Sequence, residues 1–504
     1  MPASQDKSST EASGAPDGIL PSPAPSTSRK KFDKRWLFAV VVLVAVLIVA
    51  IVVNLHSSDN GPTKITGLVT IDNGDQKINW DRYSITDMEL SDSLTITDSG
   101  IYHLTSTLTD GMVTIDSGVK GEVKLILDNV SITNSSGPAI SCVSGDDLVI
   151  ELVGENVLED GAAYSANLDE DINGVLYSKA DLSFIGDGTL NIVSNYQDAI
   201  VGKDDIKFGG GTYNITAADD GIRGKDSVYI TGGTFNIVST EDAIKSTNDT
   251  DSDKGFILVE GGDIQISAGD DGMHAEHTFA MQGGNINIAK SYEGIEAPKI
   301  IINSGDIIVM SSDDGINAGS SSSDASTQTN DPFVQDENCE LTINGGNVYV
   351  NASGDGVDSN GHIYFNGGKV VVDGPTNNGN GALDSGIDIT MNGGEVIAVG
   401  SSGMAESMGK SSKVPSISIY FSSAQASGTK LEIKNSAGDT IMAHISAKTF
   451  TNAVIGSDIF SIGNTYTIYL NGEKYQDFTI QNTITTIGNS NSNNNMAPPN
   501  RNRK

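Results

Sequence analysis

Acidic residues recur at one fixed place in a glycine-marked unit of about 22 residues that repeats through the middle of this chain. A second acid precedes the repeated one in three copies, at Asp219, Asp270 and Asp313. Carboxylate oxygens are the ligands that Ca²⁺ prefers, so the pattern predicts calcium binding. The repeated acids are Asp198, Asp220, Asp242, Asp271, Glu293, Asp314, Asp355 and Asp384, with Asn173 one unit earlier.

The spacing of these acids indicates one acid at the same corner of each coil in a stack. From Asp198 onward the gaps are 22, 22, 29, 22, 21, 41 and 29 residues, and the longer gaps mark loops. Equivalent positions in stacked coils lie about 5 Å apart, where two carboxylates repel by about 0.9 kcal/mol even in water. A bridging cation would turn that repulsion into binding. Asp before Gly also forms good turns through bonds to nearby amides, so a turn role without cations stays open.

A shorter basic series follows the acids at Lys179, Lys203, Lys225 and Lys245. These lysines are solvated or paired surface charge, or they contact the carboxylates of an acidic sugar polymer. Lys203 and Lys225 are the candidates for a proton-abstracting base.

The elements that must position these residues are short strands. In 205–226, apolar residues alternate with polar ones, and Gly209–Gly211 and Ala218–Gly221 interrupt the alternation. Three strands and three corners fit one unit, and no apolar spacing of three to four residues supports a helix. Glycine at the corners permits positive φ. The sequence therefore predicts an all-β, single-stranded parallel β-helix over 65–410, with loops at 160–173 and 319–338.

The ends of the chain differ from this repeat. We expect 1–35 to be a disordered, basic cytoplasmic segment and 36–53 a transmembrane helix, since its 18 apolar residues suffice to span a bilayer. A cleaved signal peptide is the alternative. The stretch 54–64 reads as a linker. The stretch 411–488 shows hairpin patterns with an Asn471-Gly472 turn, which predict a small β-sheet or sandwich module. We expect 489–504 to be a disordered tail.

The net charge of −35 excludes a nucleic-acid binder, which needs the opposite sign, and favours partners reached through cations. The two cysteines, Cys142 and Cys339, lie on distant repeats, so we expect buried thiols and no disulfide.

Several linked motifs resemble the cell-surface carbohydrate-binding domain family that is related to polysaccharide lyases. The likeness covers roughly 65–488. It rests on YHLTSTLTDGMVTID (102–116), VKLILDNVSITNSSGPAI (123–140), LYSKADLSFIGDGTLNI (176–192), AADDGIRGKDSVYITGGTFNI (217–237) and SISIYFSSAQASGTKLEI (416–433).

The resemblance implies a right-handed parallel β-helix, bound Ca²⁺, and binding of cellulose-like and polygalacturonate-like polysaccharides. Its motif DDGI-x-GKD corresponds to Asp219, Asp220, Lys225 and Asp226. The variant DAI-x-GKDD corresponds to Asp198, Lys203, Asp204 and Asp205. These matches add Asp204, Asp205 and Asp226 to the expected metal ligands. In later coils Glu276-His277 and Pro298-Lys299 replace the Lys-Asp pair.

Three functions follow as hypotheses. The first is a single-pass cell-membrane protein whose extracellular domain binds polysaccharide through Ca²⁺. The second is a Ca²⁺-dependent polysaccharide lyase that uses Lys203 or Lys225 as base. The third is a structural or adhesive surface protein in which the solenoid is a spacer.

Overall fold

The computed structural model describes residues 78–118, 120–319 and 335–489. The predicted segments 1–35, 36–53 and 54–64, and all of the predicted tail except residue 489, lie outside the described residues. Within the described part, no helix is long and apolar enough to cross a membrane. The one helical turn described there is the 3-10 turn η2 (Trp80–Arg82).

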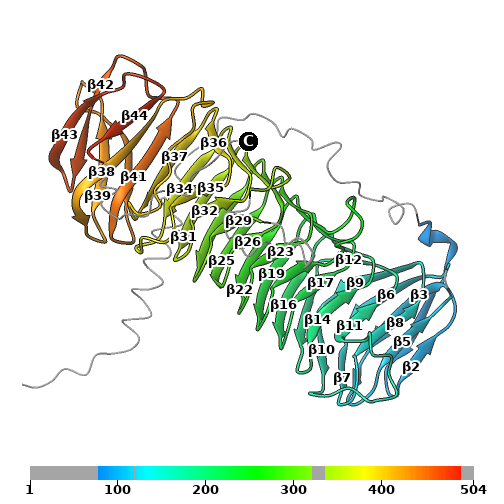
Figure 1. The fold of residues 1–504 in the computed structure, drawn as a ribbon. Coiled ribbons are helices and arrows are strands. Elements are labelled where there is room, and N and C mark those ends of the chain that lie inside the picture. The colour runs from blue at the N-terminus through cyan, green and yellow to red at the C-terminus, as the bar shows by residue number, and fades with distance from the viewer. Residues whose placement is uncertain (1–77, 119, 320–334, 490–504) are drawn as a thin grey trace, which may run out of the picture. The chain divides into compact units, whose positions relative to one another are not determined.

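Three long sheets of parallel strands, which we call sheets A, B and C, run side by side along the described chain (Figure 1). Sheet A consists of β1 (Ile85–Glu89), β3 (Gly100–Thr105), β6 (Glu122–Asp128), β9 (Asp147–Val153), β12 (Asp181–Gly186), β15 (Asp205–Phe208), β18 (Ser227–Ile230), β21 (Phe256–Val259), β24 (Thr278–Met281), β27 (Lys299–Ile302), β30 (Glu340–Ile343), β33 (His362–Phe365) and β36 (Asp388–Met391). Sheet B consists of β2 (Leu94–Ile96), β5 (Val113–Asp116), β8 (Ile140–Ser144), β11 (Gly174–Ser178), β14 (Asp198–Gly202), β17 (Ile222–Gly224), β20 (Ile244–Ser246), β23 (Met273–Ala275), β26 (Ile295–Glu296), β29 (Ile316–Ala318), β32 (Val357–Ser359) and β35 (Leu383–Ser385).

Sheet C has parallel strands followed by three strands from the C-terminal part of the chain. Its order is β4 (Thr107–Leu108), β7 (Ser131–Asn134), β10 (Glu155–Asp160), β13 (Thr189–Val193), β16 (Thr212–Ala217), β19 (Thr234–Ser239), β22 (Asp263–Ser267), β25 (Asn285–Ser291), β28 (Asp306–Ser311), β31 (Asn347–Ala352), β34 (Lys369–Asp373), β37 (Glu395–Gly400), β41 (Phe450–Ser457), β38 (Ser416–Gln425) and β44 (Ile484–Ile487). A fourth sheet, sheet D, has the order β40 (Thr440–Ile445), β39 (Lys430–Lys434), β42 (Thr465–Leu470) and β43 (Glu473–Thr479).

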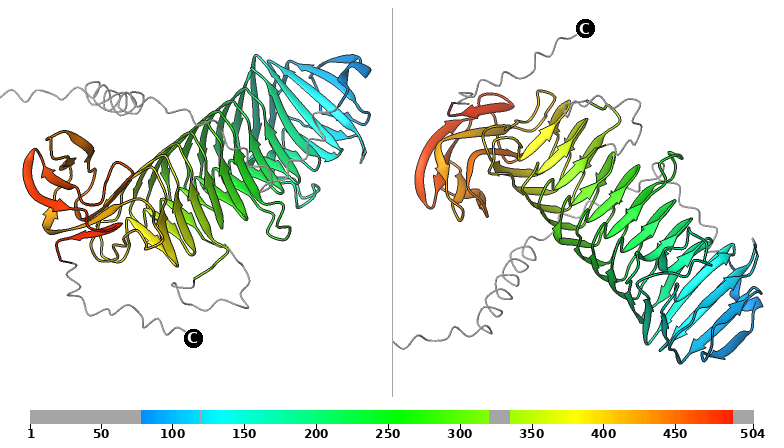
Figure 2. Two further views of the ribbon diagram at one scale, coloured as in Figure 1. Left: turned by 90° about the horizontal axis from the view of Figure 1, so that it is seen from above. Right: turned by 60° about the horizontal axis from the view of Figure 1, so that its bottom comes forward.

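Each coil takes one strand from sheet B, one from sheet A and one from sheet C, in that order, as β14, β15 and β16 do. Figure 2 shows the coils stacked one on another. Equivalent residues of successive coils pair directly: Ile200 with Ile222, and Ile222 with Ile244. The prediction of an all-β fold of stacked parallel coils is confirmed.

The inward residues of all three sheets form one continuous apolar core, which excludes water along the stack. Aromatic rings stack inside it between successive coils: Phe184 stacks on Phe208 at a centroid distance of 4.8 Å, and Tyr213 on Phe235 at 4.7 Å. Both cysteines are buried free thiols, as predicted.

Glycine forms the corner between sheets A and C because the backbone there is left-handed. Gly233 has φ 109°, and an added Cβ would lie 3.2 Å from the carbonyl oxygens of Gly210 and Gly211. The close approach of consecutive coils therefore excludes larger residues at this corner.

The last coil is covered by the C-terminal strands. β41 pairs antiparallel with β37, so the parallel stacking of sheet C ends there. A second apolar core, which includes Ile397, Ile417, Ile433 and Ile468, packs sheet D against the outer side of sheet C. The buried Asp373 carboxylate of β34 accepts hydrogen bonds from Tyr349, His444 and Ser446, and this network joins sheet D to the coils.

Candidate cation and ligand site

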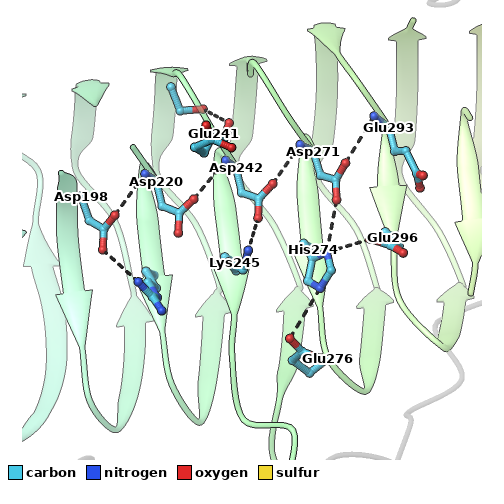
Figure 3. A network of polar contacts seen from close by, with 12 residues as sticks. Asp198, Asp220, Glu241, Asp242, Lys245, Asp271, His274, Glu276, Glu293 and Glu296 are labelled. Carbon is cyan, nitrogen blue, oxygen red and sulfur yellow. Dashed lines mark hydrogen bonds and ion pairs between the residues drawn. The ribbon is translucent and has the colours of Figure 1, made fainter. Parts of the chain in front are cut away.

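The repeated acids form a column at the corner between sheets C and B, where each precedes or opens a strand of sheet B (Figure 3). The side chain of one acid accepts a hydrogen bond from the backbone N–H of the acid in the next coil. The N–H of Asp220 donates to Oδ1 of Asp198 at 3.1 Å, and that of Asp242 to Oδ1 of Asp220 at 3.0 Å. One oxygen of each carboxylate is thus part of the contact between coils.

The bonded column extends through most of the predicted corner acids. The backbone N–H of Asp271 donates to Oδ1 of Asp242 at 2.9 Å, and that of Glu293 to Oδ1 of Asp271 at 3.3 Å. The N–H of Asp355 donates to the Asp314 carboxylate, and the series ends where the N–H of Gly381 donates to the Asp355 carboxylate. Asp198, Asp220, Asp242 and Asp271 are buried, whereas Glu293 and Asp314 are half-buried. The corner acids therefore do bond to backbone amides at the turns, as the structural alternative predicts.

Asp384 is not a member of this column, so its assignment to a corner was wrong. Gly381 occupies the corner, and Asp384 lies inside β35, paired with Asp358 of the preceding coil. Because the stretch 374–382 before β35 is irregular, the corner falls at residue 381, three residues before the position expected from the repeat. Asn173 is adjacent to the first member: its Nδ2 donates to Oδ2 of Asp198 at 2.6 Å.

The second oxygen of several column acids meets a side chain on the outer face of sheet B, three residues after a corner position. Asp198 Oδ2 lies 3.4 Å from Arg223, which is three residues after Asp220. Asp242 Oδ2 lies 2.6 Å from Lys245, and Asp271 Oδ2 lies 3.2 Å from His274. We call this outer row the i+3 row; it consists of Val201, Arg223, Lys245, His274, Glu296, Asn317, Asp358 and Asp384, each paired with the next in sheet B.

The i+3 row changes from basic to acidic along the stack. Glu296 follows Glu293, and Asp358 follows Asp355, so later corner acids face another carboxylate. Burial and the charge of Glu296 raise the pKa of Glu293 to about 8. Burial and Asp384 likewise raise the pKa of Asp355 to about 7, although the Gly381 N–H lowers it. Burial raises the pKa of Asp358 far above its ordinary value. Carboxyl groups at this end of the column therefore hold their protons to a higher pH than ordinary acids do.

Burial raises the pKa values of the earlier corner acids too. It raises the pKa of Asp198 to about 6 against the effect of Arg223. The pKa of Asp220 rises to about 7 through burial and the charges of Asp198 and Asp242. For Asp271 and Asp314, burial is again the main cause of a pKa raised to about 6.

One predicted group of metal ligands is present at the first of these corners. Asp198, Asp219 and Asp220 offer carboxylate oxygens that all lie within 4.8 Å of one another. Asp219 is half-buried beside the two buried members. Three convergent carboxylates without a nitrogen or sulfur donor fit the preference of Ca²⁺ for oxygen. The other doubled acids, Asp270 and Asp313, are half-buried beside Asp271 and Asp314.

A second carboxylate group lies at the other end of strand β14, where sheet B turns into sheet A. Asp204 and Asp205 meet Asp181 of the previous coil, with oxygens within 4.8 Å of one another. Burial and the adjacent Asp226 raise the pKa of Asp204 to about 6.

Asp226 itself is already neutralised. Lys254 pairs with one of its oxygens, and Asn248 donates to the other at 2.7 Å. Although burial opposes it, the contact with Lys254 lowers the pKa of Asp226. The predicted ligands Asp204 and Asp205 thus come together with Asp181, while Asp226 is occupied by protein groups.

The four lysines do not form one column, which corrects their grouping. Lys203 and Lys225 follow the ends of equivalent strands, and Thr247 takes that place in the next coil. Lys245 belongs to the i+3 row with Arg223. Burial, helped by the charge of Arg223, lowers the pKa of Lys203, whose Nζ lies 5.7 Å from the ring centre of Tyr177. Lys225 is exposed.

Sequence reasoning missed the residues that complete these groups. Asp181, Arg223, His274 and Glu296 are not among the site residues predicted from the sequence. A signal was available, because each member of the i+3 row follows a corner position by three residues. In a strand, residues of one face alternate, so a polar residue flanked by buried ones must point outward.

A family model for carbohydrate-binding domain-containing proteins matches residues 91–379, more than half of the chain. The chain therefore belongs to this carbohydrate-binding domain family. A carbohydrate-binding domain-containing protein of Acetivibrio thermocellus is 32% identical over 143 residues, which are 28% of this chain and 49% of the relative. The chain thus spans about half the length of this curated relative.

A solved structure of a polysaccharide lyase-like protein from C. thermocellum, a gadolinium derivative, is 27% identical. It matches with a TM-score of 0.40 over 44% of this chain and 96% of its own.

The raised pKa of Asp220 predicts how stability depends on pH in the chelator-treated protein. A carboxyl group whose folded pKa exceeds its unfolded value of 3.8 stabilises the fold at low pH, and this contribution is lost as pH rises from about 4 to 7. Asp220→Asn keeps an acceptor for the Asp242 N–H without the charge. We expect it to be more stable than the parent at pH 7.5 by on the order of 2 kcal/mol, and the difference to shrink at pH 5.

Urea unfolding of parent, Asp220→Asn and Asp220→Ala at both pH values measures this effect. The Ala variant serves as control, because it removes both the charge and the acceptor and should be less stable than the Asn variant by about 1–3 kcal/mol. A parent that is more stable than Asp220→Asn at pH 7.5 would contradict the assignment.

Proposed function

We propose that this chain is a membrane-anchored, extracellular protein that binds polysaccharide through Ca²⁺, with acidic, polygalacturonate-like glycans as its main ligands. Membership of the carbohydrate-binding domain family supports the polysaccharide. The single observation that carries the calcium dependence is the pair of oxygen-only carboxylate groups at the two ends of β14.

The two groups suit calcium by their chemistry and their surroundings. Each offers three carboxylates, and burial, together with neighbouring carboxylates, raises the pKa values of Asp198, Asp204 and Asp220. Ca²⁺ takes six to eight oxygen ligands, so three carboxylates leave room for water or sugar oxygens. Bound calcium would supply positive charge to which a uronate carboxylate can coordinate.

The position of the groups suits an extended ligand. Asp198 opens β14 and Asp204 follows its end, so the two groups lie about 15–20 Å apart at a rise of about 3.3 Å per residue. The outer face of sheet B lies between them and carries Arg223 and Lys245 nearby. A polyanionic chain that crosses this face would meet cations at both edges and basic side chains between. That arrangement overcomes the repulsion expected from a net charge of −35.

A second candidate, a Ca²⁺-dependent polysaccharide lyase, is favoured by one observation. The pKa of Lys203 is lowered by burial and by Arg223, so a larger fraction of its amine is unprotonated at neutral pH than in an ordinary lysine. Lys203 lies directly before the Asp204 and Asp205 carboxylates. An amine beside a cation site is the arrangement that abstraction of a proton next to a uronate carboxyl requires.

Calcium-dependent binding is checked with a glycan array read in Ca²⁺ and again in chelator. We expect polygalacturonate binding in Ca²⁺, with a loss of at least about tenfold in chelator, which equals about 1.4 kcal/mol. The double variant Asp204→Asn/Asp205→Asn should weaken binding to a similar degree in Ca²⁺. Asp477→Asn, which removes an exposed carboxylate in sheet D, is the matched control and should bind like the parent. Equal binding with and without Ca²⁺ would refute the calcium dependence, and no binding to any glycan would favour a spacer role.

Lyase activity is checked by the ultraviolet absorbance of an unsaturated uronate product on incubation with polygalacturonate and Ca²⁺. If Lys203 is the base, Lys203→Arg should keep glycan binding but lower turnover at least about 100-fold, because general-base catalysis contributes about 10²–10⁴-fold. Lys290→Arg, at an exposed site on sheet C, should leave turnover unchanged. No product from several uronans would rule out this second candidate.

The anchor is checked in cells that express the full chain. We expect the chain in the membrane fraction, with its carbohydrate-binding domain open to external protease, and a variant that lacks 36–53 in soluble fractions. A mature chain that begins after residue 53 would show a cleaved signal peptide instead.

A further inference from the structure

His274 is the one histidine of the i+3 row, and its coil differs from its neighbours in the groups that meet the corner acid. In the two preceding coils, the row carries Arg223 and Lys245, which are permanent cations without a lone pair for a metal. In the next coil the row carries Glu296. At His274 a fixed cation is therefore replaced by a side chain that can donate a nitrogen lone pair, directly beside an added carboxylate.

The nitrogen of this histidine faces two carboxylates at once (Figure 3). Nδ1 of His274 lies 3.2 Å from Oδ2 of Asp271 and 2.8 Å from Oε2 of Glu296. One N–H cannot point at both oxygens with good geometry. Asp271, Glu293 and Glu296 in turn offer oxygens within 4.8 Å of one another.

These separations are close to those of ligands around a tetrahedral metal. With metal–ligand bonds of about 2.0–2.2 Å, ligand atoms in a tetrahedral zinc site lie about 3.4 Å apart. The distances of 3.2 Å and 2.8 Å from Nδ1 of His274 to the two carboxylate oxygens would have to increase by only a few tenths of an ångström to reach this value. Asp242, in contrast, is occupied by Lys245 and by the Asp271 N–H, which leaves it outside the ligand set.

The other nitrogen of the ring lies near a further carboxylate. Nε2 of His274 lies 3.8 Å from Glu276, whose carboxylate faces the ring from the far side. Metal-bound histidines commonly present their second nitrogen to a carboxylate, which holds the ring with its ligating nitrogen toward the metal. The histidine is 9% exposed, so the ring is held in a buried setting.

We propose that Asp271, His274, Glu293 and Glu296 bind a divalent transition-metal ion of borderline softness, with Zn²⁺ as the best match, in preference to Ca²⁺. One imidazole with three carboxylates is a donor set that suits Zn²⁺, whereas Ca²⁺ selects oxygen alone. The charge of the ion balances three carboxylates that otherwise share one histidine and the hydrogen bonds from the Glu293 N–H and Asn317. This site is separate from the two oxygen-only groups at β14 and does not depend on the proposed glycan binding.

The proposal is tested by isothermal titration of the chelator-treated full chain, in detergent, with ZnCl₂ and with CaCl₂. We expect one Zn²⁺ site, seen as a saturable heat of binding at one ion per chain. That site should bind Ca²⁺ at least 100-fold more weakly.

His274→Lys is the decisive variant, because it keeps a cation beside Asp271, as Lys245 does in the coil before, but cannot ligate zinc. It should lose this Zn²⁺ site. Glu296→Gln should weaken the site at least tenfold if the lysine variant does not fold. His103→Gln is the matched control, since His103 also lies between two carboxylates, Asp87 and Asp128, but meets them through different nitrogens. Zinc binding that is unchanged in His274→Lys, or is absent in the parent, would overturn the proposal and leave His274 as a third fixed cation.

Discussion

The hydrogen bond from the backbone N–H of one coil to the corner carboxylate of the coil before is the interaction on which the account of this protein depends. It places a buried acid at the same corner of coil after coil, as in Asp198, Asp220 and Asp242. A buried carboxylate is tolerated only when its charge is balanced. One oxygen is committed to the backbone, so the second oxygen must find a cation, a proton or a metal. The coils differ mainly in which of these they supply: Arg223 and Lys245 in the first part, His274 next, and further acids beyond it.

Much of the fold could be predicted because its physical causes are local and periodic. Alternating apolar residues, glycine at tight corners and an acid at a fixed interval each repeat with the coil, so Ile200, Ile222 and Ile244 align by simple counting. Counting failed where a coil changes length. Asp384 follows an irregular stretch and falls inside β35, and Lys245 falls two residues before the place of Lys225. A change in coil length moves a side chain out of the column in which its residue type and the simple count would place it.

The candidate site was harder to predict than the fold, because it depends on contacts between coils. The acids Asp204 and Asp205 were identified, but their partner Asp181 lies one coil earlier and becomes a neighbour only through strand pairing. The sequence also cannot reveal that Asp226 is occupied by Lys254, which comes from a loop. The spacing of the i+3 row is present in the sequence. Its contacts with the second oxygens of the corner acids are known only from the structure.

The same column serves structure and chemistry in different coils. Where Lys245 meets Asp242, the corner acid mainly joins two coils. Where extra acids are added, as at Asp219 beside Asp220, negative charge exceeds what the protein groups balance, and cation binding follows as the proposed solution. This division accounts for a long, regular stack in which only a few coils carry a candidate site, and it matches a family whose members bind carbohydrate.

The most direct measurement is anomalous diffraction from crystals of the chain grown with calcium. The account predicts anomalous peaks at Asp198, Asp219 and Asp220 and at Asp181, Asp204 and Asp205, with carboxylate oxygens at about 2.3–2.6 Å from each ion. Crystals soaked in calcium that show no peak at either group, with those carboxylates bound only by protein groups, would contradict it.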